Sequence, residues 1–272
     1  MNQSLSRLRL RFESWSRFIY IGVGLLLLGW LLNTPEGLLG KADAVGYAVC
    51  HRIDLRSFHM GERQLPLCAR CTGMYLGAVL GLLYQAIIGR KRAGIPAKSV
   101  IVSVGFLVLF FAVDGLNSFL SLIPGAPFLY QPQNWWRLFS GTGMGLAIAI
   151  ALYPGFNQTM WMDYDPKSTM ESWIKFAGLL ALASLLDILV LTENPLLLYP
   201  LALISAAGVL LVLTMVYSMV WVMIIGGENR YQRVGQLLTP LVAGFGLALL
   251  QIVLLDLGRY WLTGTWDGFH LG

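Results

Sequence analysis

Seven long apolar stretches constrain this chain more than any other feature of its sequence. An α-helix needs ~20 mainly apolar residues to cross the hydrocarbon core of a bilayer, and each stretch is close to that length. Charged residues make up 12% of the chain, about half the share in soluble domains, which is roughly 25%. The sequence therefore predicts an all-α, polytopic transmembrane helical bundle, with residues 1–272 forming a single integral membrane domain. The predicted spans cover residues 18–33, 71–89, 99–121, 137–154, 173–192, 197–225 and 237–257.

The first stretch follows Arg7, Arg9, Arg11 and Arg17, as the apolar part of a signal peptide would. The residues after it, LLNTPEGLLG, contain no small-x-small cleavage site, and six more apolar stretches follow. We therefore interpret the first stretch as a span.

The placement of lysine and arginine predicts the orientation in the membrane. With the N-terminus in the cytoplasm, 12 of the 19 basic residues lie on the cytoplasmic side and 7 lie outside, as the positive-inside rule requires. We expect a multi-pass protein of the cell (inner) membrane with residues 34–70, the 122–136 connection and the C-terminus outside the cytoplasm. The net charge of +5 is then explained by topology. No basic patch alternates with aromatic residues, so nucleic acid is not an expected partner, whereas membrane lipids are.

The stretch AVCHRIDLRSFHMGERQLPLCARCTG, residues 48–73, contains all 3 cysteines of the chain and two of its 3 histidines. Cys68 and Cys71 form a C-x-x-C motif where the second span begins. Backbone N–H groups and the helix dipole favour thiolates there. Cys50 and His51 supply a third sulfur and an imidazole, and zinc accepts three thiolates with one imidazole. The predicted ligands are Cys50, His51, Cys68 and Cys71, with zinc as the expected metal and iron as an alternative.

Other interpretations of this stretch remain open. His59 is the other candidate for the fourth ligand. Cys68 and Cys71 are also compatible with a redox-active pair, with Cys50 as its resolving partner. The simplest alternative is one structural disulfide and a spare thiol, although an odd cysteine is unfavourable in an oxidising compartment.

Polar residues inside the predicted spans indicate a second site. Asp114 and Asn117 lie one turn apart in the third span, and Asn134 and Arg137 lie one turn apart at the start of the fourth. A charge within a span costs about 2.5–3.5 kcal/mol and normally has a partner or faces a cavity. We expect Asp114 to pair with Arg137, directly or through water, either to orient the two helices or as the floor of a pocket under the cysteine loop.

Two further acidic residues, Asp187 and Asp256, fall in outer halves of spans. We expect Asp256 to pair with Arg259 one turn later, and Asp187, which has no obvious partner in the sequence, to line the same cavity. His270 is expected to be a residue of the C-terminal tail. Gly73, Gly77 and Gly81, like Gly141 and Gly145, recur every fourth residue, and this spacing predicts close packing of the second and fourth spans.

These residues together resemble a prokaryotic family of membrane proteins, the domain of unknown function DUF2085. The resemblance covers about residues 45–150, leaving the spans within 173–257 as additions, and extends to Asp114, Asn134 and Arg137. The family pattern includes a histidine at the position of His51, whereas the position of His59 is usually apolar. The resemblance therefore favours His51 as the fourth ligand. It implies no activity. The motif reads Cys50-His51, Arg56-Ser57-Phe58, Gly61 and Pro66-x-Cys68-x-Arg70-Cys71-Thr72-Gly73.

Three functions are compatible with this pattern. A metal-dependent enzyme would act on a lipid or isoprenoid headgroup, with metal-bound water as nucleophile, Asp114 as base, and Arg137, Asn117 and Asn134 holding an anionic group. A thiol oxidoreductase with a quinone substrate is the second possibility. It is similar to membrane reductases of the vitamin-K-epoxide kind, although those use two cysteine pairs. In the third, zinc only fastens the loop, and the protein is a scaffold or a subunit of a membrane complex.

Overall fold

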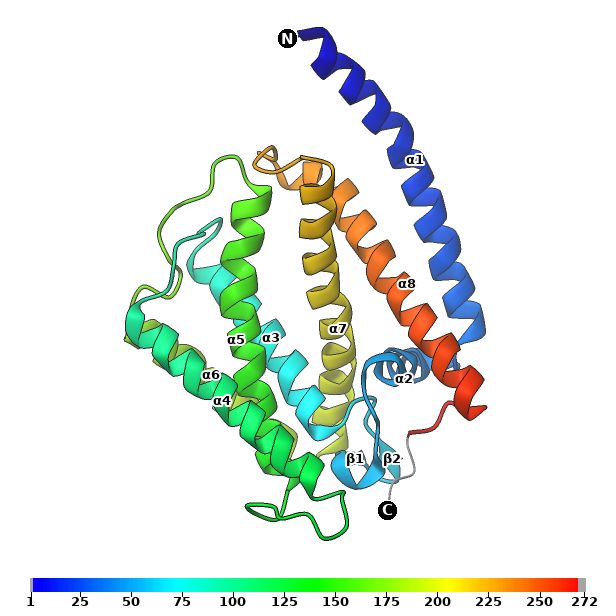
Figure 1. The fold of residues 1–272 in the computed structure, drawn as a ribbon, viewed down its shortest axis with the longest axis vertical. Coiled ribbons are helices and arrows are strands. Elements are labelled where there is room, and N and C mark those ends of the chain that lie inside the picture. Colours follow the sequence, from blue (N-terminus) through cyan, green and yellow to red (C-terminus); the bar gives the residue numbers. More distant parts are fainter. Residues whose placement is uncertain (1, 269–272) are drawn as a thin grey trace.

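The computed structural model describes the backbone of residues 2–268 and the side chains of residues 16–268. Within this range the chain forms eight α-helices, one β-hairpin and two short 3₁₀ helices (Figure 1). The α-helices are α1 (Asn2–Asn33), α2 (Gly37–Val49), α3 (Ala69–Ile88), α4 (Lys98–Leu120), α5 (Asn134–Met160), α6 (Trp173–Leu191), α7 (Pro195–Ile224) and α8 (Leu238–Thr263). The hairpin is β1 (His59–Met60) with β2 (Arg63–Gln64), and the 3₁₀ helices are η1 (Asp54–Arg56) and η2 (Val234–Leu237).

The predicted fold class is confirmed, because seven of these helices are long and apolar enough to cross a membrane. The exception is α2, which has 13 residues and lies across one end of the bundle in Figure 1. Residues 34–70, for which the sequence predicts a structured loop between two spans, contain α2, η1 and the β-hairpin.

Connections between successive spans alternate between the two ends of the bundle. At one end, which we call the cysteine end, Asn134 Nδ2 donates to the carbonyl of Ser57 at 3.2 Å, and the Tyr47 hydroxyl donates to the carbonyl of Thr265 at 2.7 Å. At the opposite end, Lys91 Nζ contacts Asp163 at 2.8 Å and also donates to the 225–233 connection. The spans therefore run antiparallel in sequence order.

The packing of α3 against α5 is the most extensive in the molecule. A Cβ atom on Gly73 or Gly77 would collide with the backbone of α5, and one on Gly145 would collide with the backbone of α3. The predicted close approach of the second and fourth spans is confirmed, and glycine is required because the two backbones touch. This contact fixes the first turn of α3, where both cysteines of the C-x-x-C motif lie.

Helices at two edges of the bundle expose apolar surface. In Figure 1, α1 runs alongside α8 at one edge, while α4 and α6 form the opposite edge. Side chains such as Leu25, Leu32, Phe106 and Leu109 on α1 and α4 are exposed. Because such surfaces are stable only in an apolar solvent, lipid covers them.

Candidate metal centre

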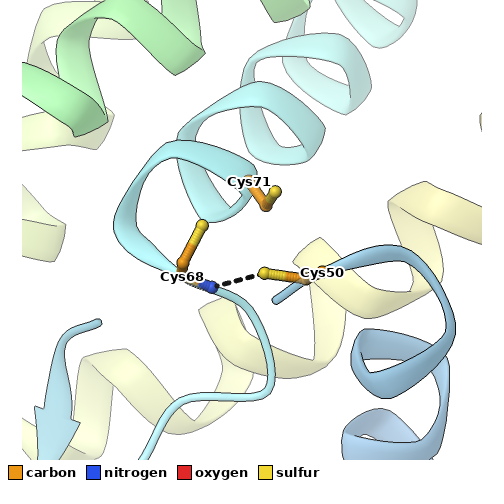
Figure 2. Close-up of side chains that lie close together, drawn as sticks. All are labelled: Cys50, Cys68 and Cys71. Carbon is orange, nitrogen blue, oxygen red and sulfur yellow. Dashed lines mark hydrogen bonds between the residues drawn. The ribbon is translucent and has the colours of Figure 1, made fainter. Parts of the chain in front are cut away.

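The three cysteines form one cluster at the cysteine end. Their Sγ atoms all lie within 4.8 Å of one another, and none is in a disulfide. Figure 2 shows Cys68 and Cys71 on the first turn of α3, with Cys50 facing them from the end of α2. Cys50 and Cys68 are buried and Cys71 is partly buried. Cys50 and Cys68 are 18 positions apart in the sequence, so folding of the 34–68 segment creates the cluster.

Close contact between α2 and the chain before α3 brings Cys50 into place. A Cβ on Gly46 would overlap the carbonyl of Pro66, so only glycine allows this approach. Cys50 ends α2, its amide donating to the carbonyl of Gly46 at 2.8 Å. Arg52 then takes a left-handed backbone conformation, with φ of 50°. This reverses the chain so that it passes over Cys50.

Backbone amides are aimed at the sulfur of Cys50. The amide of Cys68 donates to Cys50 Sγ at 3.3 Å, and the amide of Arg52 does so at 3.5 Å. The neighbouring thiols of Cys68 and Cys71 hold the pKa of Cys50 well below its usual value. The same contact with Cys50 raises the pKa of Cys68 to about 12. The cluster is therefore arranged for one stable thiolate at Cys50, the form that binds metals.

Neither histidine that the sequence offered as a fourth ligand joins this cluster in the part of the chain described. His51 Nδ1 accepts from the amide of Ile53 at 2.9 Å, and burial lowers its pKa, which favours a neutral ring. His59 Nε2 pairs with Asp54 at 2.9 Å on the hairpin side. Cys50 has extended backbone, and consecutive side chains on extended backbone point to opposite sides. His51 is therefore directed away from the sulfurs.

The surroundings of the cluster are apolar. Cys50, Cys68 and the partly buried Cys71 pack with residues of α1, α2, α7 and α8, among them Trp30 and Ile252. Burial in such surroundings removes the sulfurs from solvent, and metal ligands commonly lie in such a shell, which controls access and dielectric.

Asp114 does not pair directly with Arg137 as the sequence had suggested. Its carboxylate is bound by the Arg70 guanidinium, by the Tyr130 hydroxyl at 2.8 Å and by the Ser140 hydroxyl at 2.9 Å. Arg137 instead donates to Ser118 Oγ at 3.3 Å and to Asn134. The direct pair that we expected is wrong, because Arg70, one residue before Cys71, reaches across to α4 and binds this carboxylate.

The two asparagines bind backbone groups of neighbouring segments, and Asn134 also binds Arg137. Asn117 accepts from the amide of Leu129 at 2.6 Å and donates to the carbonyl of Tyr130 at 2.9 Å, which ties the 121–133 connection to α4. Asn134 donates to the carbonyl of Ser57 and accepts from Arg137 at 2.8 Å. Both side chains therefore position segments around Asp114.

The polar network around Asp114 and the cysteines lie on different sides of α3. Cys68, Cys71 and Tyr75 pack toward α7 and α8, whereas Arg70 reaches Asp114 on α4 and Gly73 contacts α5. The sequence had placed a metal directly over a pocket floored by Asp114. In the structure Asp114 is bound by Arg70 at one face of α3, whereas Cys71 packs toward α7 and α8, so the carboxylate and the sulfurs lie against different faces of this helix.

Asp187 and Asp256 also have partners other than those considered. Asp187 accepts from Thr142 on α5 at 2.6 Å, and Asp256 accepts from Trp30 on α1 at 3.2 Å. Within the described residues no ion pair joins Asp256 to Arg259. The guanidinium of Arg259 donates to the carbonyls of Tyr47 and Cys50, each at 2.7 Å. His270 lies outside the described residues.

Three residues that the sequence analysis did not place in a site have clear roles here. Arg70 and Tyr130 bind Asp114, and Arg259 holds the backbone of Cys50 from the far end of the chain. For Arg70 the available signal was its position between two candidate ligands at a helix start. Nothing in the sequence links Arg259 to Cys50, because 209 positions separate them.

The fold and this cluster define the class: a polytopic helical membrane protein with three buried or partly buried cysteines gathered at one end of the bundle. Residues 50–151 match the family model described as "Predicted membrane protein (DUF2085)". The resemblance noted from the sequence is therefore confirmed, and the matched region starts at Cys50 and includes the whole cluster.

Two archaeal relatives are similar to part of the chain. One, an uncharacterized protein of Methanothermobacter thermautotrophicus, is 29% identical over 102 residues, which is 38% of this chain and 82% of the relative. The other, an uncharacterized protein of Methanocaldococcus jannaschii, is 25% identical over 122 residues, or 44% of this chain and 72% of the relative. No solved structure matches.

Proposed function

We propose that Cys50, Cys68 and Cys71 bind one zinc ion, and that this metal centre fastens the 34–68 segment onto the bundle. The observation that carries the proposal is the convergence of three sulfurs within 4.8 Å from two separate elements. Three thiolates are a donor set that zinc prefers, and the metal-binding form of Cys50 is already favoured. The zinc ion would stabilise the folded position of the 34–68 segment, because structural zinc contributes directly to folding energy.

A catalytic role for the metal has less support. Hydrolysis with Asp114 as base would need this carboxylate near the metal. Asp114 instead lies across α3 from the sulfurs, bound by Arg70 and Ser140. Thiol exchange would need an accessible sulfur, and Cys50 and Cys68 are buried. We therefore favour the scaffold role over a lipid hydrolase or a quinone-linked oxidoreductase.

Metal content of the purified protein tests the proposal. We expect about one zinc per chain in the wild-type protein and loss of zinc in Cys50→Ser and in the double variant Cys68→Ser/Cys71→Ser. His59→Ala is the matched control, because His59 pairs with Asp54 away from the sulfurs, and it should retain the metal. His51→Ala tells whether this ring takes the fourth position. A metal-free wild-type protein with two of its thiols oxidised would instead support the redox alternative.

A separate observation supports a second function: positive charge is in excess around Asp114. Arg56 donates to the carbonyl of Ser118 at 2.8 Å, which places it beside Arg70 and Arg137. Burial, followed by the charge of Arg70, lowers the pKa of Arg56. Three guanidinium groups, those of Arg56, Arg70 and Arg137, thus form an arginine cluster near one carboxylate, which Arg70 contacts directly. We propose that an anionic lipid headgroup binds there, since arginine suits phosphate.

The lipids that the purified protein retains test this second proposal. In native mass spectrometry from mixed phosphatidylglycerol and phosphatidylcholine, we expect wild-type protein to retain phosphatidylglycerol preferentially. Arg56→Gln should reduce that preference. Arg63→Gln removes the same charge from the exposed hairpin, where it pairs with Asp43 at 2.7 Å, and should leave the preference unchanged. Equal effects of the two substitutions would show that overall charge, rather than this cluster, attracts the lipid.

A further inference from the structure

A cavity of about 540 Å³ lies between α1 and α8, on the side of the molecule away from Asp114. Most of its lining is apolar and comes from Leu25, Leu26, Trp30, Val253 and Leu257. Its volume is in the range typical of small-molecule sites, roughly 300–1,000 Å³. Neither the metal centre nor the arginine cluster uses this space.

One carboxylate lines the cavity with an unused oxygen. Asp256 is 3% exposed, and its Oδ2 accepts from Trp30 Nε1 at 3.2 Å. Its Oδ1 is buried and has no hydrogen-bond partner. A buried acceptor without a partner is unfavourable, and an ionisable group within a span usually marks a functional position. The missing partner is therefore the feature to explain.

Two other polar side chains of the lining, those of Asn33 and Thr34, are committed elsewhere, whereas Tyr260, which also lines the cavity, is exposed. Asn33 donates to the carbonyl of Gly29 at 2.7 Å, and Thr34 donates to the carbonyl of Trp30 at 2.8 Å. Both bonds stay within the end of α1. Asp256 Oδ1 thus remains the acceptor for a donor brought in from outside, in a space whose walls favour apolar groups.

We propose that this cavity binds an elongated apolar molecule whose polar end donates a hydrogen bond to Asp256. A long-chain alcohol and a long-chain amine share this chemistry: the chain packs against α1 and α8, and the hydroxyl or ammonium group reaches Oδ1. An alkane of the same length would pack against the apolar walls equally well, but it has no donor and would leave the Asp256 carboxylate unpaired. Specificity therefore depends on the donor, because a site with a buried polar group rejects an analogue that leaves it unpaired.

The glycines of α1 provide a pair of variants for the test. Gly29 lines the cavity and Gly24 does not, and an added Cβ at either position meets nothing within 4 Å. Gly29→Leu should fill the cavity without disturbing the bundle, whereas Gly24→Leu adds the same side chain outside it. Asp256→Leu removes the acceptor. Because Asp256→Leu also removes the partner of Trp30 and can affect folding, the glycine pair keeps the test interpretable.

The experiment is photolabelling of the full chain in phosphatidylcholine nanodiscs with hexadecanol that carries a diazirine on its chain. We expect saturable labelling of peptides from α1 and α8. Asp256→Leu should reduce labelling by at least about tenfold, which is the effect of one hydrogen bond to a charged group. Gly29→Leu should reduce labelling at least as much because it fills the cavity, and Gly24→Leu should leave labelling unchanged. Unlabelled hexadecanol or hexadecylamine should compete, and their order identifies hydroxyl or ammonium as the preferred donor.

The proposal is overturned if hexadecane competes as well as hexadecanol, because the cavity is then a groove for lipid chains in general. It is equally overturned if Gly29→Leu and Gly24→Leu have the same effect, or if labelling does not saturate.

Discussion

Arg70 lies between two candidate metal ligands in the sequence, yet its side chain belongs to the opposite side of α3. The guanidinium binds Asp114 and lies over the ring of Phe111 at 5.8 Å. Cys68 and Cys71 face the other way, toward Cys50. One helical turn therefore contributes to two separate sites. A substitution at one of these residues has consequences for only one site, provided that the turn itself stays folded.

Asp114→Asn tests the Arg70 pair. The change keeps the shape of the side chain but leaves Arg70 without its charged partner in a site where Asp114 is fully buried. Breaking a buried ion pair in this way costs about 3–5 kcal/mol, so we expect a markedly lower midpoint of thermal unfolding in detergent. Asp163→Asn, which breaks the more exposed pair with Lys91, is the control and should leave the midpoint nearly unchanged, because solvent screens an exposed ion pair. Similar midpoints for the two variants would contradict the account.

The site could be predicted in part from single residues. The C-x-x-C spacing and the distant Cys50 predicted a cluster of three cysteines, and the cluster is present in the structure. Partner choice could not be predicted in the same way. Asp114 had candidate partners on several helices, and Arg70 binds it only because glycines bring α3 into backbone contact with α5 and so fix the rotation of α3. Such rotations depend on packing across the whole bundle.

At the scale of elements, the glycine contact between α3 and α5 supports both sites. Gly77→Ala introduces a Cβ against the backbone of Thr142, so the helices must separate. We expect destabilisation of about 1–3 kcal/mol, as for overpacking generally, and a lower unfolding midpoint. Gly105→Ala on α4 adds the same methyl group where nothing lies within 4 Å, and its effect should be within about 0.5 kcal/mol. An unchanged midpoint for Gly77→Ala would show that the contact is not tight.

Sequence patterns predicted the long elements and missed the short ones. Spans were recognisable because each needs a long apolar run, whatever its neighbours are. The helix α2 contains Lys41, Asp43 and three glycines in 13 residues, so its sequence carries no such run. It is held by tertiary contacts instead, including those of Gly46 with Pro66 and of Tyr47 with the chain after α8.

For the whole molecule, we propose the orientation that the basic residues predict, with the cysteine end outside the cytoplasm. Glu62 on the hairpin and Glu228 in the 225–233 connection are exposed at opposite ends of the bundle. We expect a membrane-impermeant maleimide to label Glu62→Cys in intact cells, and Glu228→Cys only after permeabilisation. Wild-type protein gives the background from its own cysteines. The reverse pattern would invert the proposed topology.

The central claim is that the three cysteines act together as the ligands of one metal ion. X-ray absorption at the zinc edge, on protein purified in detergent, tests it most directly because the spectrum counts the sulfur neighbours of the metal. The account predicts about three sulfur atoms at roughly 2.3 Å and one lighter nitrogen or oxygen atom. A shell made only of nitrogen and oxygen would place the zinc elsewhere in the molecule and would contradict the claim.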